Sequence, residues 1–238
     1  MSDGFTDFSF DQGNEKVTKK NNRFKAKEGE TYRMSLVWLR VDDEGNPNWD
    51  KPIRFTGCER HYLAGVGYFL HKGPEYSKLA GGPPKQQVAC ICIVWPTLAR
   101  GKLDKEKFAK GEDVEVYWWG FSSEKYDQIK LRNDNYPLTE NDLVVNCTDT
   151  QYQKMDISTA PGNLFRKLWE SDKPHGRKMA EALWEQIKEM EDTLRAEIAR
   201  DLTLEQIREK LGGSGGGPVP EGASAEDVDG LLDNLLDD

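Results

Sequence analysis

The sequence predicts a mainly β protein whose strands are followed by helices and an acidic tail. Five or six short runs rich in Val, Ile and aromatic residues are separated by Gly- and Pro-containing turns, which is typical of a small barrel or sandwich. From about Leu164 the apolar residues recur at three- and four-residue steps, the period of a helix. Residues 212–238 contain seven acidic residues and no Lys or Arg. These three observations define the predicted fold class.

Residues 1–29 are predicted to form a flexible N-terminal arm. Residues 1–15 are polar and acidic, whereas KVTKKNNRFKAK (16–27) contains six basic residues and no acid. The six are Lys16, Lys19, Lys20, Arg23, Lys25 and Lys27. Such runs occur in arms that bind nucleic acid and also in arms that are merely solvated, so the run alone fits both interpretations.

Residues 30–160 are predicted to form the β domain. Its strands are expected in TYRMSLVWLRV (31–41), PIRFTGC (52–58), QQVACICIVW (86–95), DVEVYWWGF (113–121), DLVVNCT (142–148) and TQYQKMDIS (150–158). Residues 59–80 fit neither period and are interpreted as an insertion between strands. SEKYDQIKL (123–131) predicts a short helix.

Residues 161–211 are predicted to be helical. One apolar stripe consists of Met179, Leu183, Ile187, Met190, Leu194 and Ile198. Thr203 and Gln206 form a capping-box pattern at the start of a last short helix, which ends at Gly212-Gly213. A flexible linker is expected at 212–222 and an acidic tail at 223–238.

The charge is divided unevenly along the chain. The net charge is −9, yet residues 16–110 carry 19 Lys and Arg against 10 Asp and Glu, hence +9, and residues 212–238 carry −7. A basic body joined to an acidic tail points to nucleic acid more than to catalysis.

The four cysteines, Cys58, Cys90, Cys92 and Cys147, do not suggest a disulfide framework. Cys90 and Cys92 would share one face of an apolar strand, which predicts buried free thiols in a reducing compartment. Cys58 and His61 offer a C-x-x-H pair, but the second closely spaced pair of ligands that a zinc site needs is missing. We expect no metal and no other cofactor.

The run around Val114–Trp119 is the most informative for function. Side chains alternate along a strand, so Val114, Val116 and Trp118 would share the core face. Tyr117 and Trp119 would then point outward, where unpaired bases can stack on them. The alternative is that the C-terminal helices cover this second face and make both rings part of a core.

Other candidate residues place aromatic rings beside positive charge. Tyr152 and Lys154 would share one face of their strand, a pattern that suits stacking of one base and contact with its phosphate. The further candidates for nucleic-acid binding are Phe55, Arg54, Arg60, Tyr62, Lys72, Lys85, Lys19, Lys20, Arg23 and Lys25. Trp38 aligns with Met34 and Leu36 and is expected in the core.

The sequence does not suggest an enzyme. It contains no G-x-x-x-x-G-K loop and no H-E-x-x-H, and its three histidines are scattered. It has no run of apolar residues long enough for a membrane span and no secretory pattern at its N-terminus. We expect a cytoplasmic protein, in the host cell if it is viral, that does not bind membranes.

Taken in order, these segments resemble the single-stranded DNA-binding proteins of bacteriophages, of the helix-destabilising type. The resemblance lies in VACICIVWP (88–96), VYWWGFSSEKYDQIK (116–130), QYQKMDI (151–157) and the terminus DVDGLLDNLLDD (227–238). It implies an OB-fold-like five-stranded barrel with an insertion, followed by helices and the tail. That family type has a zinc-binding insertion, but this insertion offers only Cys58, His61 and His71, so zinc is not carried over.

The resemblance also implies that the tail recruits replication or recombination proteins, in roles that include repair. The tail residues expected to contact such partners are Asp229, Leu231, Leu232, Asp233, Leu235, Leu236, Asp237 and Asp238. We expect binding to single-stranded DNA, or RNA, with little sequence preference, by a monomer or a weakly self-associating protein. One alternative is an acidic interaction protein, such as a DNA mimic or an inhibitor of a basic enzyme. Another is a metal-dependent nuclease.

Overall fold

The computed structural model of the protein describes residues 22–149 and 154–213. The strands are β1 (Thr31–Leu36), β2 (Arg40–Val41), β3 (Pro47–Asn48), β4 (Thr56–Leu63), β5 (Gly67–Leu70), β6 (Lys85–Trp95), β7 (Thr97–Leu98), β8 (Lys102–Leu103), β9 (Glu115–Phe121), β10 (Asn141–Cys147) and β11 (Met155–Pro161). The helices are α1 (Pro74–Ala80), α2 (Lys105–Lys110), α3 (Ser123–Asn135), α4 (Leu164–Trp169), α5 (Pro174–Ile198) and α6 (Leu204–Gly213), and a 3-10 turn, η1 (Ala99–Gly101), joins β7 to β8.

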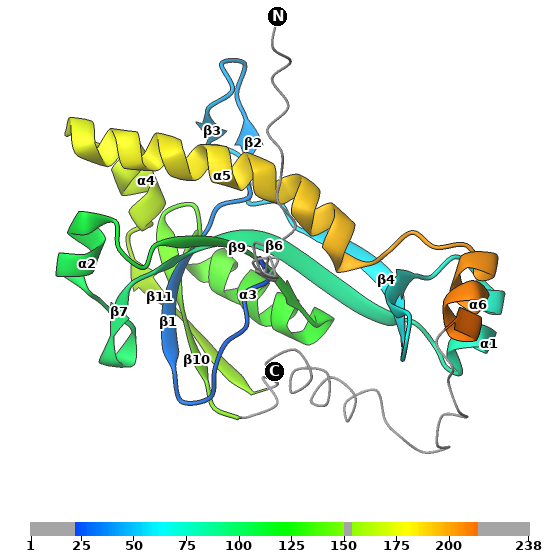
Figure 1. The fold of residues 1–238 in the computed structure, drawn as a ribbon. Coiled ribbons are helices and arrows are strands. Elements are labelled where there is room, and N and C mark those ends of the chain that lie inside the picture. The colour runs from blue at the N-terminus through cyan, green and yellow to red at the C-terminus, as the bar shows by residue number, and fades with distance from the viewer. Residues whose placement is uncertain (1–21, 150–153, 214–238) are drawn as a thin grey trace, which may run out of the picture.

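The fold is mainly β and is built on one antiparallel sheet of seven strands (Figure 1). The strand order is β11-β10-β1-β6-β4-β5, and β9 pairs with β6 as well. β4 pairs with residues 85–89 of β6 and β1 with residues 92–95, while β9 pairs with residues 88–94 along the opposite edge. The long strand β6 therefore holds the sheet together.

The expected closed barrel is not found. Among the described residues no pairing joins β11 to β9 or to β5, so the path of strands stays open. α3 lies beside the outer edge of β11 instead, where Arg132 donates a hydrogen bond from Nε to the carbonyl of Ile157 at 3.0 Å. On this edge the Arg132 side chain thus supplies a hydrogen bond that a neighbouring strand would otherwise supply.

Both faces of β6 and β9 are buried. Ile91, Ile93 and Trp118 belong to a core beneath α4 and α5, whereas Cys90 and Trp119 belong to a second core on the opposite face. This explains why the sequence of β6 is apolar almost throughout rather than alternating, as in strands covered on both sides. The prediction that Trp119 points outward is wrong, because its face is covered by other parts of the chain.

The predicted helical stripe is confirmed in α5, which crosses one face of the sheet (Figure 1). Its residues Leu183, Ile187, Met190, Leu194 and Ile198 are buried against the sheet. On the same helix, Glu191 accepts hydrogen bonds from Trp38 Nε1 and from both terminal nitrogens of Arg54. Chain segments on the two sides of residue 160 therefore share one core.

The predicted insertion at 59–80 contains the end of β4, β5 and α1. These elements pack against α6 around a small third core formed by Val66, Phe69, Tyr76 and Ile207. The capping box at the start of α6 is confirmed, since Thr203 N donates to Gln206 Oε1 at 2.9 Å and Gln206 N donates to Thr203 Oγ1 at 3.3 Å. The last helix therefore docks on the insertion.

The described end of the N-terminal arm is packed on the sheet. Phe24 N donates to the carbonyl of Trp118 at 2.8 Å, and Trp118 N donates to the carbonyl of Asn22 at 2.9 Å. Phe24 is 5% exposed and Ala26 is 1% exposed. Residues 22–26 thus extend the free edge of β9 and do not form a flexible arm.

All four cysteines are free, and three of them are buried, as predicted for Cys90 and Cys92. Burial raises the pKa of the Cys90 thiol and of the Cys92 thiol, which keeps both protonated. Cys58 packs against the core beneath α5, while the ring of His61 lies 5.6 Å from that of Phe69 in the third core. The two side chains of the C-x-x-H pair therefore point in different directions.

Candidate nucleic-acid interface

Seven aromatic rings form a continuous row on the face of the sheet opposite α5. This ring row consists of Tyr32, Phe24, Tyr117, Trp119, Phe121, Phe55 and Tyr126. The ring centroid of Phe24 lies 5.0 Å from that of Tyr32, 6.1 Å from that of Tyr117 and 5.9 Å from that of Trp119. The packed end of the N-terminal arm thus supplies the ring that joins β1 to β9.

The row continues from β9 to α3. The Trp119 and Phe121 centroids are 4.8 Å apart, and Phe55 lies 6.4 Å from Phe121 and 5.1 Å from Tyr126. The rings of Phe24, Trp119 and Phe121 are buried. The other four rings of the row, Tyr32, Tyr117, Phe55 and Tyr126, are half-buried. Rings held on one side by neighbouring rings lose little rotamer freedom when a base stacks on the other side.

Lysines lie near both ends of the row, at Tyr32 and at Tyr126. We call Lys25, Lys27, Lys125 and Lys154 the basic rim. Lys27 N donates to the hydroxyl oxygen of Tyr32 at 3.0 Å, and Gly29 N donates to the carbonyl of Cys147 at 2.9 Å. Backbone bonds therefore hold the Lys27 segment against β10 next to the ring of Tyr32.

The other half of the rim lies at the connection between β10 and β11 and in the first turn of α3. Lys154 N donates to Asp149 Oδ2 at 3.2 Å, and the Lys154 side chain is exposed. Burial lowers the pKa of Lys125, while the charge of the nearby Asp149 works in the opposite direction. Lys125, in the first turn of α3, is therefore partly desolvated.

Two acids hold the hydroxyl groups of tyrosines in the ring row. The Tyr32 hydroxyl donates to Glu30, and the Tyr117 hydroxyl donates to Glu115. Burial and the hydrogen bond to Glu30 raise the pKa of Tyr32, so this phenol stays neutral. The edge of each of these tyrosine rings is thereby fixed.

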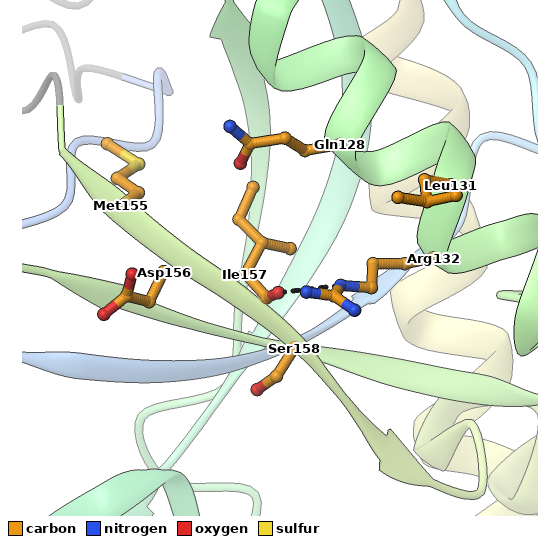
Figure 2. A pocket seen from close by; sticks show the side chains of 7 residues that line it. All are labelled: Gln128, Leu131, Arg132, Met155, Asp156, Ile157 and Ser158. Carbon is orange, nitrogen blue, oxygen red and sulfur yellow. Dashed lines mark hydrogen bonds between the residues drawn. The ribbon is translucent and has the colours of Figure 1, made fainter.

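A groove continues from the rim between α3 and β11. Its volume is about 380 Å³, and its lining residues are Gln128, Leu131, Arg132, Met155, Asp156, Ile157 and Ser158. Figure 2 shows the Arg132 side chain directed at the Ile157 carbonyl, with Asp156 and Ser158 pointing to the other side of β11. Because Met155 directly follows Lys154, the groove begins at the basic rim.

The aromatic residues predicted to bind nucleic acid differ in burial and in position. Trp119 is 2% exposed and belongs to the middle of the ring row, so it has no free face for a base. Tyr117 and Phe55 are half-buried members of the same row. Tyr62 lies outside it, on β4, with its ring 5.0 Å from that of Tyr68.

Two of the predicted arginines hold the fold together. Arg60 is 6% exposed, donates to Gln87 Oε1 and to the Ile198 carbonyl, and lies 3.6 Å from the centroid of the Tyr68 ring. Arg54 forms an ion pair with Glu191 and stacks over Trp38. Each of these arginines is thus committed to partners on α5 or β6.

The remaining predicted basic residues are scattered. Arg23 lies over the ring of Trp118 at 5.5 Å, on the face that carries α5. Lys72 forms an ion pair with Asp201, and Lys85 is exposed at the start of β6 beside Arg60. Of the predicted basic residues within the described part of the chain, only Lys25 and Lys154 belong to the basic rim.

Several predicted residues lie outside the described residues. They are Lys19, Lys20 and Tyr152 together with the tail residues Asp229, Leu231, Leu232, Asp233, Leu235, Leu236, Asp237 and Asp238.

Sequence reasoning missed Tyr32, Phe24 and Lys125 as parts of the site. Tyr32 shares a strand face with the buried Met34 and therefore gave no signal of its own. Phe24 is hidden in a basic run, and its burial depends on β9, which lies far away in the sequence. Lys125 stands next to Tyr126 in the predicted helix, and this pair of a lysine and an aromatic residue is the sequence feature that could have identified it.

No protein-family model, curated protein or solved structure matches the chain. Among the described residues, no group of three or more His, Cys, Asp or Glu side chains is arranged to hold a metal ion. In the same part of the chain, none of the helices combines the length and the apolar character that crossing a bilayer requires.

Proposed function

We propose that this protein binds single-stranded DNA, or RNA, with little sequence preference at the ring row and the basic rim. The observation that carries the proposal is the continuity of the rings, with half-buried tyrosines next to exposed lysines on one face of the sheet. Stacking on aromatic rings tolerates any base, since each base has a π face, and contributes about 1–3 kcal/mol per base. The resemblance to bacteriophage single-stranded DNA-binding proteins agrees with this assignment.

In the proposed mechanism the rings and the lysines have separate tasks. Tyr32, Tyr117 and Tyr126 present ring faces whose orientation is fixed by their neighbours, so bases stack at a small entropic cost. Lys27 and Lys154 contact phosphates and release counterions. The half-buried Lys125 strengthens the attraction because charges act over a lower effective dielectric there.

The proposal also covers the tail. Residues 223–238 alternate acids with pairs of leucines, a composition that suits docking of a short amphipathic helix on a partner protein. We propose that this segment recruits replication or recombination proteins and competes weakly for the basic rim when no strand is bound.

Salt titration with labelled oligo-dT tests the proposal. Replacing Lys27 and Lys154 by alanine removes two rim charges, which lowers the slope of log K against log salt by about 1.4, at about 0.7 per phosphate contact on single strands. The matched control is Lys173→Ala with Lys178→Ala, two exposed lysines at the start of α5. Equal slopes for the two double variants would move the phosphate contacts away from the rim.

The readout should be anisotropy of the labelled strand rather than tryptophan fluorescence. Six of the seven tryptophans are buried and Trp49 is half-buried against Phe165 on the α5 side, so quenching by stacked bases is not expected. A protein that does not bind oligo-dT at either low or moderate salt would sink the proposal and favour an acidic interaction protein instead.

A further inference from the structure

The short β7–β8 hairpin has an unusual backbone at its tip. Arg100 has φ 62° and ψ 28°, in the left-handed region, and is followed by Gly101 with φ 71°. Arg100 is one of only two residues other than glycine with positive φ in the described part of the chain. Gly or Asn would adopt this conformation with less strain, so the arginine is kept at a conformational cost. Costs of this kind gather at functional sites.

The hairpin is fixed on the sheet. Thr97 Oγ1 donates to the carbonyl of Thr31 at 3.0 Å. A Cβ added to Gly101 would lie 2.8 Å from Val144 Cγ1 and 3.0 Å from Thr31 Cγ2, so the turn lies directly on β1 and β10. The strained arginine therefore stands on a rigid base.

The side chains of the tip face solvent. Leu98 is 51% exposed, and Arg100 and Lys102 are exposed as well. Neither Arg100 nor Lys102 has an ion pair in the described part of the chain. In the adjoining α2, by contrast, Lys107 and Lys110 are paired with Asp113 and Glu106. The two cations at the tip are thus available for a partner.

The hairpin and the ring row meet at the first residues of β1. Thr31, on which the hairpin rests, and Tyr32, at the end of the ring row, are consecutive residues and point to opposite faces of the strand. In Figure 1 the hairpin stands beside the start of β1. A strand of nucleic acid that leaves the row at Tyr32 and crosses the end of β1 reaches Arg100 and Lys102.

We infer that the β7–β8 hairpin is a second contact for the bound strand, in which Arg100 and Lys102 bind phosphates and Leu98 packs against the adjoining sugar or base. This inference rests on the proposed function and extends its footprint around the end of β1. The guanidinium of the exposed Arg100 is a planar fork, which suits a phosphate.

The main test uses two double variants. The tip variant combines Arg100→Ala and Lys102→Ala, and the matched control combines Lys107→Ala and Lys110→Ala. Each double variant removes two positive charges from the segment that contains the β7–β8 hairpin and α2. With oligo-dT of about 16 nucleotides, the tip variant is expected to lose on the order of 10-fold in affinity at low salt and about 1.4 in salt slope. An oligo-dT of about 6 nucleotides is expected to contact the ring row alone, so both variants should bind it with the affinity of the wild type.

The outcomes separate the two proposals. A wild-type protein that binds no oligonucleotide overturns the proposed function and this inference with it. A wild-type protein that binds, with equal losses for the tip and control variants on the longer strand, overturns the hairpin contact alone.

Arg100→Gly gives an independent readout that a merely structural role would not produce. Glycine relieves the left-handed strain, so the Tm is expected to rise by about 2 °C even as affinity for the longer strand falls. Arg100→Lys should retain most of the affinity, since it keeps the charge. A glycine variant with unchanged affinity, or a lysine variant as weak as alanine, contradicts the assignment.

Discussion

At the scale of single residues, neighbouring side chains on β9 serve different cores. Trp118 lies beneath α5, and its Nε1 donates to Glu197 at 2.6 Å. Trp119, the next residue, is enclosed on the other face by Phe24 and Phe121. Adjacent tryptophans therefore hold two layers onto one strand, and each contributes mainly to stability.

Trp119→Ala is expected to destabilise the protein rather than to report on base stacking. A ring that is 2% exposed leaves a cavity when it is removed, and a loss of about 3–5 kcal/mol in the free energy of unfolding is typical. Chemical denaturation measures this loss. Tyr136→Ala, at a residue that is 54% exposed, is the control and should change stability by less than about 1 kcal/mol. Near-wild-type stability of the Trp119 variant would mean that the second core is not packed as described.

The alternation of a strand predicts which residues share a face but not what covers that face. Tyr117 and Trp119 were correctly placed on one side of β9, opposite Val116 and Trp118. Their cover comes from Phe24 and from α3, whose positions depend on contacts between distant parts of the chain. Arg54 and Arg60 illustrate the same limit, because their partners Glu191 and Ile198 lie on α5.

At the scale of elements, the β4–β5 hairpin, α1 and α6 form a unit whose histidines face one another. His61 Nε2 and His71 Nδ1 are 2.9 Å apart, so one ring nitrogen must donate while the other accepts. Protonating both rings would place two N–H groups face to face. Burial and then the neighbouring His71 lower the pKa of His61, while Glu59 works against them.

The stability of the protein is therefore expected to fall as the pH falls through and below about 6.5. The unfolded chain binds a proton at His61 near the ordinary histidine pKa of about 6.5, whereas the folded chain resists it. Stability from the neutral ring is thus present above that pH and is lost as the pH approaches the lower, folded pKa. Urea unfolding at several pH values between about 7 and 5 measures the loss.

Two histidine variants separate this pair from the remaining titrating groups. His61→Phe, next to Phe69, should remove most of the pH dependence in this range. His175→Asn changes an exposed histidine in the first turn of α5 and should leave the dependence as it is. If the two variants show the same pH dependence, the pair does not carry it.

The elements themselves could largely be predicted from the sequence. The helical period of α5, the capping box of α6 and most strands follow from local patterns, and α3 begins at the expected residue. The open sheet could not be predicted, because closure depends on whether α3 or another strand lies beside β11. The docking of α6 on the insertion likewise depends on a contact between Tyr76 and Leu202 that no local pattern encodes.

At the scale of the whole molecule, the sign of the charge changes along the chain. Residues 16–110 carry +9 and residues 212–238 carry −7, and on this ground we propose that the tail is attracted to the basic rim. At low ionic strength such an attraction reaches over about 30 Å and, in the proposed mechanism, competes with the strand, whereas at high salt it is screened within a few ångströms.

Removing residues 219–238 is therefore expected to tighten binding of oligo-dT at low salt, with a difference from the full chain that disappears as salt is raised. Two full-length variants separate charge from partner contacts. Asparagine at Asp229, Asp233, Asp237 and Asp238 should reproduce the tighter binding, because it removes charge and keeps length. Serine at Leu231, Leu232, Leu235 and Leu236 should leave it unchanged, because the acids remain. Unchanged or weaker binding after truncation would show that the tail does not compete for the rim, and the leucine pairs would then act on partners without regulating the strand.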